Sequence, residues 1–515
     1  LLKTKGEFNF SKIKIISSLL NINISNIEDF KARVDLKTNI DLELNNKYRI
    51  KKLYYSVDGE IPTSEIYFKE KKIVKKYLPD YTDSIILKDS KIKLSKIDSN
   101  NMIELNGLMK IKNEFDSFNL KQIYNYNKKN TNIAGKVDLT NSKFNISKLN
   151  YNKDRGIKSE INFDINFIVN KYFNIKKLIF VSDKTKIDIT ELKLDRNFET
   201  NDFKKIEIKT FKSGEKNNDF QIIKNNQVII LGKIFDAEPL LKSLFTKDGG
   251  KIFSKEFNSE IQINFDKTIT GTNDDVNDFA MIATIKKGSF NKLSLKGNFS
   301  ENEIVEISIY QIDNKKRTLQ VISDRARPFI KNFNFIEGFE EGKLEYESII
   351  SKEISNSNLI ITDFKVSKVP ALAQLLTLAS LQGIADTLSG EGIRFETFEM
   401  KSNSKGNVLN IEDALAIGPA VSILLEGYVD KGKLVSLRGT LVPATKLNAI
   451  IASIPLVGDI LVGKKTGEGI VGVSFKMKGP PKDIKTTVNP IKTLTPRFIV
   501  RAIEKMKKKK KEETK

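Results

Sequence analysis

Strict alternation of apolar and polar residues is the feature that most constrains how this chain can fold. Between Ile40 and about Ile361 the chain repeats short runs in which every second residue is Ile, Leu, Val or Phe. Successive side chains of an extended strand point to opposite faces, so each run has one apolar face and one polar face. Asn, Asp, Gly and Lys turns separate the runs, which favours a long antiparallel or meandering sheet and a mostly β fold.

Two arrangements of such a sheet are consistent with the alternation. The strands could close into a sandwich or barrel whose apolar faces pack together, or they could form an open, curled and elongated sheet with an apolar groove. An open sheet of roughly 30 to 40 strands, spaced about 4.8 Å apart, would extend for roughly 150 to 190 Å. The candidate groove-lining residues are Phe163, Ile165, Phe167, Ile261, Ile263, Phe265, Val305, Ile307 and Ile309.

The composition excludes much enzyme chemistry. The chain contains no Cys and no His, so it cannot form a thiol nucleophile, a disulfide, a Ser-His-Asp triad or an ordinary zinc site. An enzyme built from this chain would depend on carboxylates, Lys or Tyr. This composition agrees with our prediction that the chain has no catalytic residue, no metal ligand and no cofactor and is not an enzyme.

The chain is strongly basic, with a formal net charge of +22. Such a charge is consistent with an anionic partner, either nucleic acid or an anionic membrane. Lys, Asn and Ile are abundant while Arg is scarce, which is the usage that an A/T-rich genome favours and which accounts for much of the basicity. No aromatic stacking platform accompanies the lysine run at the C-terminal end, so we do not expect a nucleic-acid partner.

Two apolar helices are expected near the C-terminus, each followed by a strand. The first begins near Pro370, a favoured first-turn residue, and lies in an uncharged stretch from Val369 to Ala385 that is borderline in length for a membrane span. The second is interrupted by Pro455. A helix without a polar face is either buried in protein, where it could cover the end of the sheet, or in contact with lipid. The candidate membrane-contacting residues of these helices are Leu375, Leu376, Ile450 and Ile451.

The last residues, 495–515, are expected to form a basic amphipathic helix and tail. From Arg497 onward there are nine basic and three acidic residues, a net charge of +6. Each basic residue can contribute about 1 kcal/mol of attraction near an anionic membrane. A solvated, frayed terminus is the alternative. The candidate membrane-contacting residues here are Arg497, Phe498, Ile499, Arg501 and Lys505.

Ordered motifs between about Ser323 and Ile503 carry a resemblance to a known family. They include Ser323-Asp324-Arg325, Gly342-Lys343-Leu344, Val369-Pro370-Ala371-Leu372-Ala373, Gly390-Glu391-Gly392, Arg438-Gly439-Thr440-Leu441-Val442-Pro443-Ala444 and Gly467-Glu468-Gly469. This stretch resembles the C-terminal region of the AsmA-like proteins, in particular the YhdP-type branch of the Gram-negative envelope. Residues 232–241 are similar to a recurrent element of the family, a strand that ends in a short helix. We therefore divide the chain into a β-groove region (1–322), an AsmA-like region with apolar helices (323–494) and the basic tail (495–515).

The resemblance implies a bridge-like lipid-transfer protein whose partners are phospholipid, the inner membrane and the outer membrane. An N-terminal helix would anchor such a protein in the inner membrane, a curled β-groove would cross the periplasm, and the C-terminal end would reach the outer membrane. The chain begins at Leu1 and shows no such anchor, so we expect it to be a fragment or a processed form. The family is not known for catalytic residues.

Two functions are consistent with these features. In the first, phospholipid moves along the groove between the two membranes and supports the lipid homeostasis of the outer membrane. In the second, the chain is a structural or assembly factor of the cell envelope that binds outer-membrane proteins, and its apolar face is an ordinary core. The two functions differ in whether the apolar face is open to lipid.

Overall fold

The structure is a computed structural model that describes residues 1–20, 24–69, 72–168, 171–244, 257–313, 316–330, 338–351, 354–378, 382–443, 472–481 and 483–491. Within these residues there are 29 strands, six α-helices and one 3-10 helix. Of these strands, 27 belong to one sheet, which is not closed, and the other two form a small separate sheet. The mostly β, antiparallel fold predicted from the alternation is confirmed. The elongated form of the sheet stays a prediction.

The chain divides into two compact units. The first comprises Leu1–Pro239, Lys251–Asp266 and Ile285–Ser289, and the second comprises Leu240–Gly250, Lys267–Thr284 and Phe290–Lys515. The boundary at residue 322 drawn from the sequence lies within a strand of the second unit, β21 (Lys316–Ser323).

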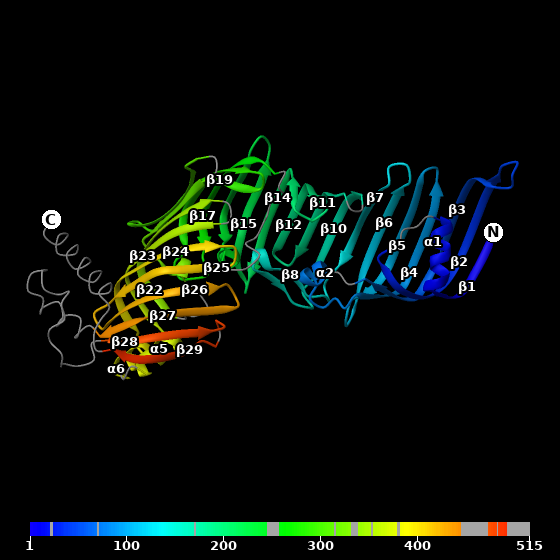
Figure 1. The fold of residues 1–515 in the computed structure, drawn as a ribbon. Helices are drawn as coiled ribbons and strands as arrows, with labels where there is room; N and C mark the ends of the chain where they lie inside the picture. Colours follow the sequence, from blue (N-terminus) through cyan, green and yellow to red (C-terminus); the bar gives the residue numbers. More distant parts are fainter. Residues whose placement is uncertain are drawn as a thin grey trace, which may run out of the picture. The chain divides into compact units, whose positions relative to one another are not determined.

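The first unit is an antiparallel meander (Figure 1). Each strand pairs with its neighbour in the sequence, with two exceptions in the described residues. β7 pairs with β10, because β8 and β9 pair with each other, and β12 pairs with β14 as well as with the short β13. Its elements are β1 (Leu2–Asn9), α1 (Phe10–Leu20), β2 (Ile27–Leu44), β3 (Ile50–Phe68), α2 (Lys72–Tyr77), β4 (Ser84–Ile97), β5 (Asn100–Lys110), β6 (Phe115–Asn125), β7 (Asn130–Asp138), β8 (Phe144–Ile146), η1 (Ser147–Leu149), β9 (Tyr151–Lys153), β10 (Ser159–Ile168), β11 (Tyr172–Ser182), β12 (Thr185–Asp195), β13 (Thr200–Asp202), β14 (Lys205–Lys212), β15 (Glu215–Lys224) and β16 (Val228–Asp236).

The strands of this first-unit sheet begin and end along two long edges that run across the strands, and these two edges carry different connections. Alternate connections of a meander lie at the same edge, so α1, α2 and the β8–η1–β9 segment all follow strand ends at one edge, which we call the helical edge. The turns 45–49, 98–99, 126–129 and 196–199 lie at the opposite edge, which we call the hairpin edge.

Helix α1 was not expected from the sequence, because Ile13 and Ile15 alternate with lysines as they would in a strand. The residue before the helix, Asn9, decides the local structure. Its Oδ1 accepts a hydrogen bond from the backbone N–H of Lys12 at 3.1 Å. An Asn side chain that satisfies a free N–H in the first turn is a favourable helix start.

Three elements lie between the two meanders along the chain: α3 (Glu238–Leu244), β17 (Ser259–Ile269) and β18 (Val276–Lys286). The meander of the second unit begins with β19 (Ser289–Ser300). The succession of β16 and α3 gives the strand that ends in a short helix at residues 232–241.

The second unit is also an antiparallel meander, in which each strand from β19 to β29 pairs with the next. Its elements are β20 (Glu303–Gln311), β21, α4 (Arg327–Ile330), β22 (Gly338–Ser351), β23 (Ile354–Ser367), α5 (Pro370–Leu378), α6 (Gln382–Ser389), β24 (Ile393–Lys405), β25 (Val408–Ile417), β26 (Val421–Asp430), β27 (Leu434–Pro443), β28 (Gly472–Gly479) and β29 (Lys485–Ile491).

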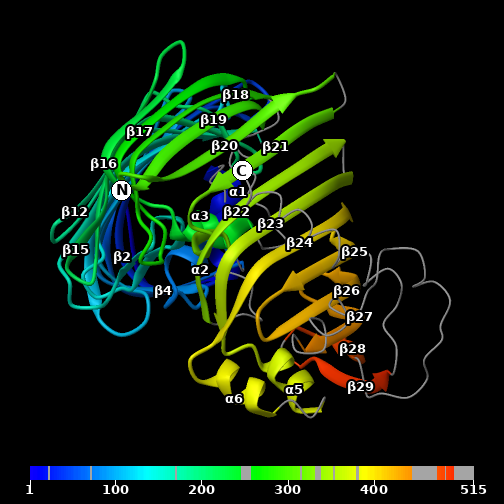
Figure 2. The ribbon, with the colours of Figure 1, turned by 90° about the vertical axis from the view of Figure 1, so that its left-hand side faces the viewer.

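Helices α5 and α6 cover part of the apolar face of the second unit, beside β29 (Figure 2). Helix α5 begins at Pro370, as predicted. After α6 the N–H of Gly390 bonds to the carbonyl oxygen of Asp386 at 3.0 Å, and Gly392 has a φ of 91°. These glycines therefore end the helix and turn the chain into β24, since a positive φ favours Gly.

Candidate functional site

An apolar row crosses the first unit from β2 to β16 through twelve successively paired strands. Residues directly opposite each other in paired strands lie on the same face of the sheet, so the register identifies the row. We call it the first apolar row. Its members are Leu36, Gly59, Ile92, Leu105, Leu120, Gly135, Phe163, Leu178, Ile189, Ile206, Ile222 and Ile230. No polar side chain interrupts it.

The glycines of this row are covered by the leucines beside them. A Cβ atom at Gly135 would lie 2.6 Å from Cδ2 of Leu120, and one at Gly59 would lie 2.8 Å from Cδ2 of Leu36. The leucine side chains therefore lie over the glycine backbone, which keeps the surface of the row apolar.

All residues of the first apolar row are half-buried. If the sheet were part of a closed sandwich, side chains from the two facing sheets would interdigitate into a core. The residues of the row, which lie in the middle of the sheet, would then be fully buried. A neighbouring row, nearer the helical edge, is more deeply buried. It consists of Phe118, Val137, Ile161, Phe180, Ile187, Ile208 and Phe220. The first unit thus has a buried apolar margin at one edge and a partly open apolar strip along its middle.

Segment 139–158, which contains β8, η1 and β9, covers the buried margin. The rings of Phe144 and Tyr151 lie 4.8 and 6.0 Å from the ring of Phe180, whose side chain is 1% exposed. We call this segment the strap. Because Phe180 is on the apolar face, the strap lies on that face, at the helical edge.

The other face of the same sheet is polar and carries alternating charges. Lys37, Asp58, Lys93, Glu104 and Lys121 follow one another across five strands. Nζ of Lys93 lies 3.6 Å from Asp58, and Nζ of Lys121 lies 2.8 Å from Glu104. Opposite charges on neighbouring strands contribute modestly to the stability of a solvated sheet face. The two faces of the sheet therefore differ in chemistry.

A second apolar row crosses eleven strands of the second unit. Its members are Leu295, Ile307, Val321, Tyr346, Leu359, Met400, Ala414, Leu425, Gly439, Phe475 and Val488. The ring of Phe475 lies over Gly439, because a Cβ atom there would meet its Cζ at 2.6 Å. Most members of the second apolar row are half-buried, while Val321, Ala414 and Phe475 are buried.

The apolar face beside this second row forms a closed core. Phe339, Phe364 and Phe395 stack at 5.4 Å between ring centroids. Leu375 and Leu376 of α5 are 1% and 0% exposed in the same cluster. These two candidate membrane-contacting residues therefore face protein. Ile450, Ile451, Arg497, Phe498, Ile499, Arg501 and Lys505 lie outside the described residues.

The nine residues predicted to line a groove are distributed over several rows. Phe163 belongs to the first apolar row and Ile307 to the second. Ile165, Phe167, Ile263 and Ile309 are half-buried, while Ile261, Phe265 and Val305 are buried. The sequence analysis missed the other members of the rows. Their alternation was visible, but the register that places them in one line was not.

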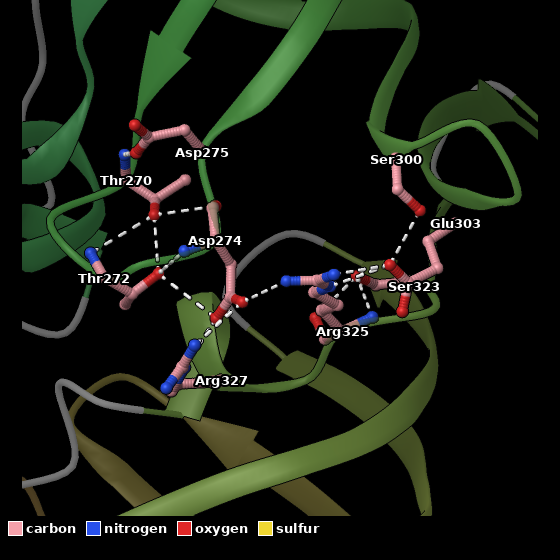
Figure 3. Close-up of polar contacts among 9 residues, drawn as sticks. All are labelled: Thr270, Thr272, Asp274, Asp275, Ser300, Glu303, Ser323, Arg325 and Arg327. Carbon is pink, nitrogen blue, oxygen red and sulfur yellow. Dashed lines mark hydrogen bonds and ion pairs between the residues drawn. The ribbon is translucent and has the colours of Figure 1, made fainter.

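A buried charge cluster lies between the β17–β18 turn and α4, within the second unit (Figure 3). The Asp274 side chain is 3% exposed. Arg327 donates to its Oδ2 from Nε at 2.5 Å and to its Oδ1 from Nη2 at 2.8 Å, and Arg325 donates from Nη1 at 2.7 Å. Burial by itself raises the pKa of Asp274, but the hydrogen bonds from Arg327 and Arg325 outweigh it and hold that pKa below its ordinary value.

This cluster joins two connections rather than forming a reactive site, because every charge in it has an opposite partner. Arg325 also donates to Glu303, from Nη2 at 2.5 Å. Within the described residues, no group of three or more acidic side chains is arranged to hold a metal ion.

No described helix reaches both the length and the hydropathy of a segment that spans a bilayer. Comparison of the chain with protein-family models, curated proteins and solved structures finds no match.

Proposed function

We propose that the protein binds the acyl chains of phospholipids along its apolar rows and transports phospholipid between the inner and outer membranes of a Gram-negative envelope. The first apolar row carries this proposal, since it is uninterrupted over twelve strands and half-buried throughout. The motifs between Ser323 and Ile503, which resemble the AsmA-like family, support the envelope and the two membranes as its place of action.

The energetic need for such a row follows from hydrocarbon chemistry. Each methylene group exposed to water costs about 0.8 kcal/mol, so a sixteen-carbon chain costs roughly 12 kcal/mol. The first apolar row extends over eleven strand spacings, about 53 Å along the sheet. Side chains that replace water along this length remove most of the cost. Transport then needs no covalent step and is reversible, so net direction comes from a gradient or a partner.

A charge placed in the row tests the proposal. Ile189→Asp puts a carboxylate in the first apolar row, where desolvation disfavours it beside an acyl chain. We expect the affinity of the first apolar row for phospholipid to fall by at least about ten-fold, which corresponds to 1.4 kcal/mol. The phospholipid that co-purifies with the gently isolated protein, measured by mass spectrometry, should decrease accordingly. Phospholipid transfer between donor and acceptor vesicles should fall with it.

Thr190→Asp is the matched control. Thr190 is the next residue on the polar face, and Nζ of Lys177 donates to its hydroxyl at 3.0 Å, so a carboxylate there gains a cationic partner. We expect normal lipid content in this variant. A folded Ile189→Asp protein with unchanged lipid content would contradict the proposal.

An envelope scaffold is the second candidate, and the closed core around Leu375 and Leu376 favours it for the second unit. A scaffold would be isolated free of lipid and would retain an outer-membrane protein partner in the Ile189→Asp variant. Lipid-free protein that still captures such a partner would therefore replace the first proposal with this one.

A further inference from the structure

The two long edges of the first unit offer different chemistry to a lipid. Beside Phe180 the helical edge is covered by the strap, which is held by buried polar contacts. Asn217 and Asn218 donate to the carbonyl oxygen of Leu149 at 3.0 and 2.9 Å. The Asn218 side chain is 0% exposed. Buried hydrogen bonds of this kind are costly to break, because the freed groups have no water to replace their partners.

Charged contacts hold the same edge. Nζ of Lys153, which is 3% exposed, donates to the carbonyl oxygens of Leu139, Thr140 and Ile157 at 2.7, 3.1 and 3.3 Å. Arg155 binds both carboxylate oxygens of Asp80, at 2.9 and 2.7 Å. The strap is thus tied both to itself and to the segment after α2. A headgroup could pass the edge at the strap only by breaking these contacts.

The hairpin edge has an aromatic band on its apolar face. In register across this edge lie Tyr55, Lys96, Asn101, Tyr124, Thr131, Phe167, Phe173 and Leu194. The Tyr124 and Tyr126 rings are 5.2 Å apart, and the Phe173 ring lies 5.2 Å from Phe167 and 4.7 Å from Phe198. The hydroxyl of Tyr55 donates to Oδ1 of Asn101 at 3.0 Å. Tyr55 and Asn101 are buried, whereas Tyr124 and Tyr126 are half-buried. The amphipathic ring of Tyr is typical of the boundary between hydrocarbon and water.

Cations accompany the aromatic band. Lys96 lies on the apolar face, with Nζ 5.5 Å from the centre of the Tyr126 ring. Lys128 and Lys129 are exposed in the turn after Tyr126, and Lys171 is exposed in the next hairpin. The acidic Asp195 at this edge already accepts hydrogen bonds from the backbone N–H groups of Asn197 and Glu199. Ammonium groups beside an apolar strip suit a phosphate attached to acyl chains.

We propose that the hairpin edge is the headgroup edge of the first unit. A phospholipid lies with its acyl chains on the first apolar row, its glycerol region against the aromatic band and its phosphate near Lys96 and Lys128, while the strap closes the opposite edge. This inference rests on the proposed function and adds the orientation and the headgroup chemistry of the ligand.

Photo-crosslinking of the full chain tests the orientation. Vesicles of phosphatidylglycerol would carry a diazirine either on the headgroup or in the acyl chain, and labelled peptides would be identified by mass spectrometry. We expect the headgroup probe to label residues 96–101, 124–131 and 194–199, and the acyl probe to label strands of the first apolar row. If the headgroup probe labelled residues 139–158 while the acyl probe still labelled the first apolar row, the proposed orientation would be wrong but the proposed function would stand. Absence of labelling by both probes would overturn the proposed function as well.

A pair of variants tests the phosphate contact. Lys96→Gln combined with Lys128→Gln should lower headgroup labelling by at least about five-fold. This lower bound is the effect of losing a single cation near a phosphate, about 1 kcal/mol. Lys121→Gln combined with Lys136→Gln removes the same charge from the polar face, where these lysines pair with Glu104 and Glu160, and should leave labelling unchanged. An equal loss in both pairs would overturn the contact. Millimolar inorganic phosphate should not compete, and full competition would show a free-phosphate site instead.

Discussion

At the scale of single residues, Asp274 illustrates how one carboxylate orders two connections of the second unit. Its loop comes before β18, whereas Arg325 and Arg327 come after β21. A buried carboxylate with two guanidinium partners gives little net stability compared with an apolar core, but removing it leaves Arg327 without the anion that it binds and leaves Arg325 with Glu303 alone. The cluster therefore specifies how these two connections meet (Figure 3).

Asp274→Asn should destabilise the second unit by about 1–3 kcal/mol, since Arg327 loses its anion and Arg325 keeps only Glu303, while both arginines are partly exposed. Hydrogen exchange of peptides covering residues 267–284 and 316–330 would measure the change. Glu303→Gln is the control, because the Glu303 side chain is 37% exposed and a solvated pair contributes about 0–1 kcal/mol. Similar exchange in both variants would contradict the role given to Asp274.

Acid should weaken the same cluster. Arg325 lowers the pKa of Glu303. The nearby Asp324 is not a member of the cluster, but hydrogen bonds from the N–H of Ile304 and from Lys343 lower its pKa as well. Asp274 also has a lowered pKa. Because these pKa values are lower in the folded chain, their stabilisation is complete above the ordinary carboxyl range of about pH 4. It is lost as the pH falls through the folded values.

Urea unfolding followed by circular dichroism would check this dependence. We expect the difference in stability between the natural chain and Asp274→Asn to be constant from pH 7 to 5 and to shrink below about pH 4. A difference that persists unchanged at low pH would show that the charge of Asp274 is not what stabilises the cluster.

At the scale of elements, the strap and α1 show how side chains outside the sheet define its edges. Both follow strand ends at the helical edge, and both place apolar side chains on the apolar face. Phe10 and Ile13 of α1 pack beside the buried Phe30 and Val34, as Phe144 and Tyr151 of the strap pack on Phe180. Each covers one margin of the face and leaves the middle of the sheet partly open.

Asn218→Ala should loosen the strap. The change removes the donor to Leu149 and the acceptor for the backbone N–H of Asp236, which Oδ1 of Asn218 binds at 2.9 Å. The carbonyl oxygen of Leu149 keeps its bond from Asn217. The N–H of Asp236 is therefore the buried group that loses its partner, at a cost of about 1–3 kcal/mol. We expect faster proteolysis and hydrogen exchange in residues 139–158. Asn152→Ala, at an exposed position of the strap, should leave both rates unchanged, and a rate increase in this control alone would contradict the role of Asn218.

At the scale of the whole molecule, each of the two units carries an apolar row of its own. The first row is half-buried throughout, whereas α5 and α6 and a buried cluster border the second. If both rows hold lipid, the amounts bound in the two units should respond separately to substitutions.

Leu359→Asp, in the second apolar row between Tyr346 and Met400, should therefore lower the number of phospholipids per chain without abolishing binding. Combining it with Ile189→Asp should remove the remainder. Native mass spectrometry would count the bound lipids. Asn358→Asp is the control, because Asn358 is exposed and faces Lys401 across the sheet. Complete loss of lipid from Leu359→Asp alone would show that the rows do not act separately.

Much of the architecture was predictable because alternation is a local property. The segment from Ile161 to Phe167 alternates strictly and forms β10, and Pro370 begins α5. Helix α1 was not predictable from alternation, because a single side chain, Asn9, favours the helix through a bond to Lys12. The partners of Asp274 were not predictable either. A loop rich in Asn and Asp indicates a turn, but not which arginines will reach it.

The sequence by itself determined that the strands have one apolar and one polar face, because side-chain direction in a strand alternates with each residue. It could not determine which residues of different strands stand in one line, since register depends on pairing between segments and on bulges such as that between Asp164 and Ile165. Only the tertiary structure placed Phe163, Leu178 and Ile189 side by side and left them half-buried. Solvent access to a row depends on what packs above it, and α1, the strap and α5 decide that through contacts between distant segments.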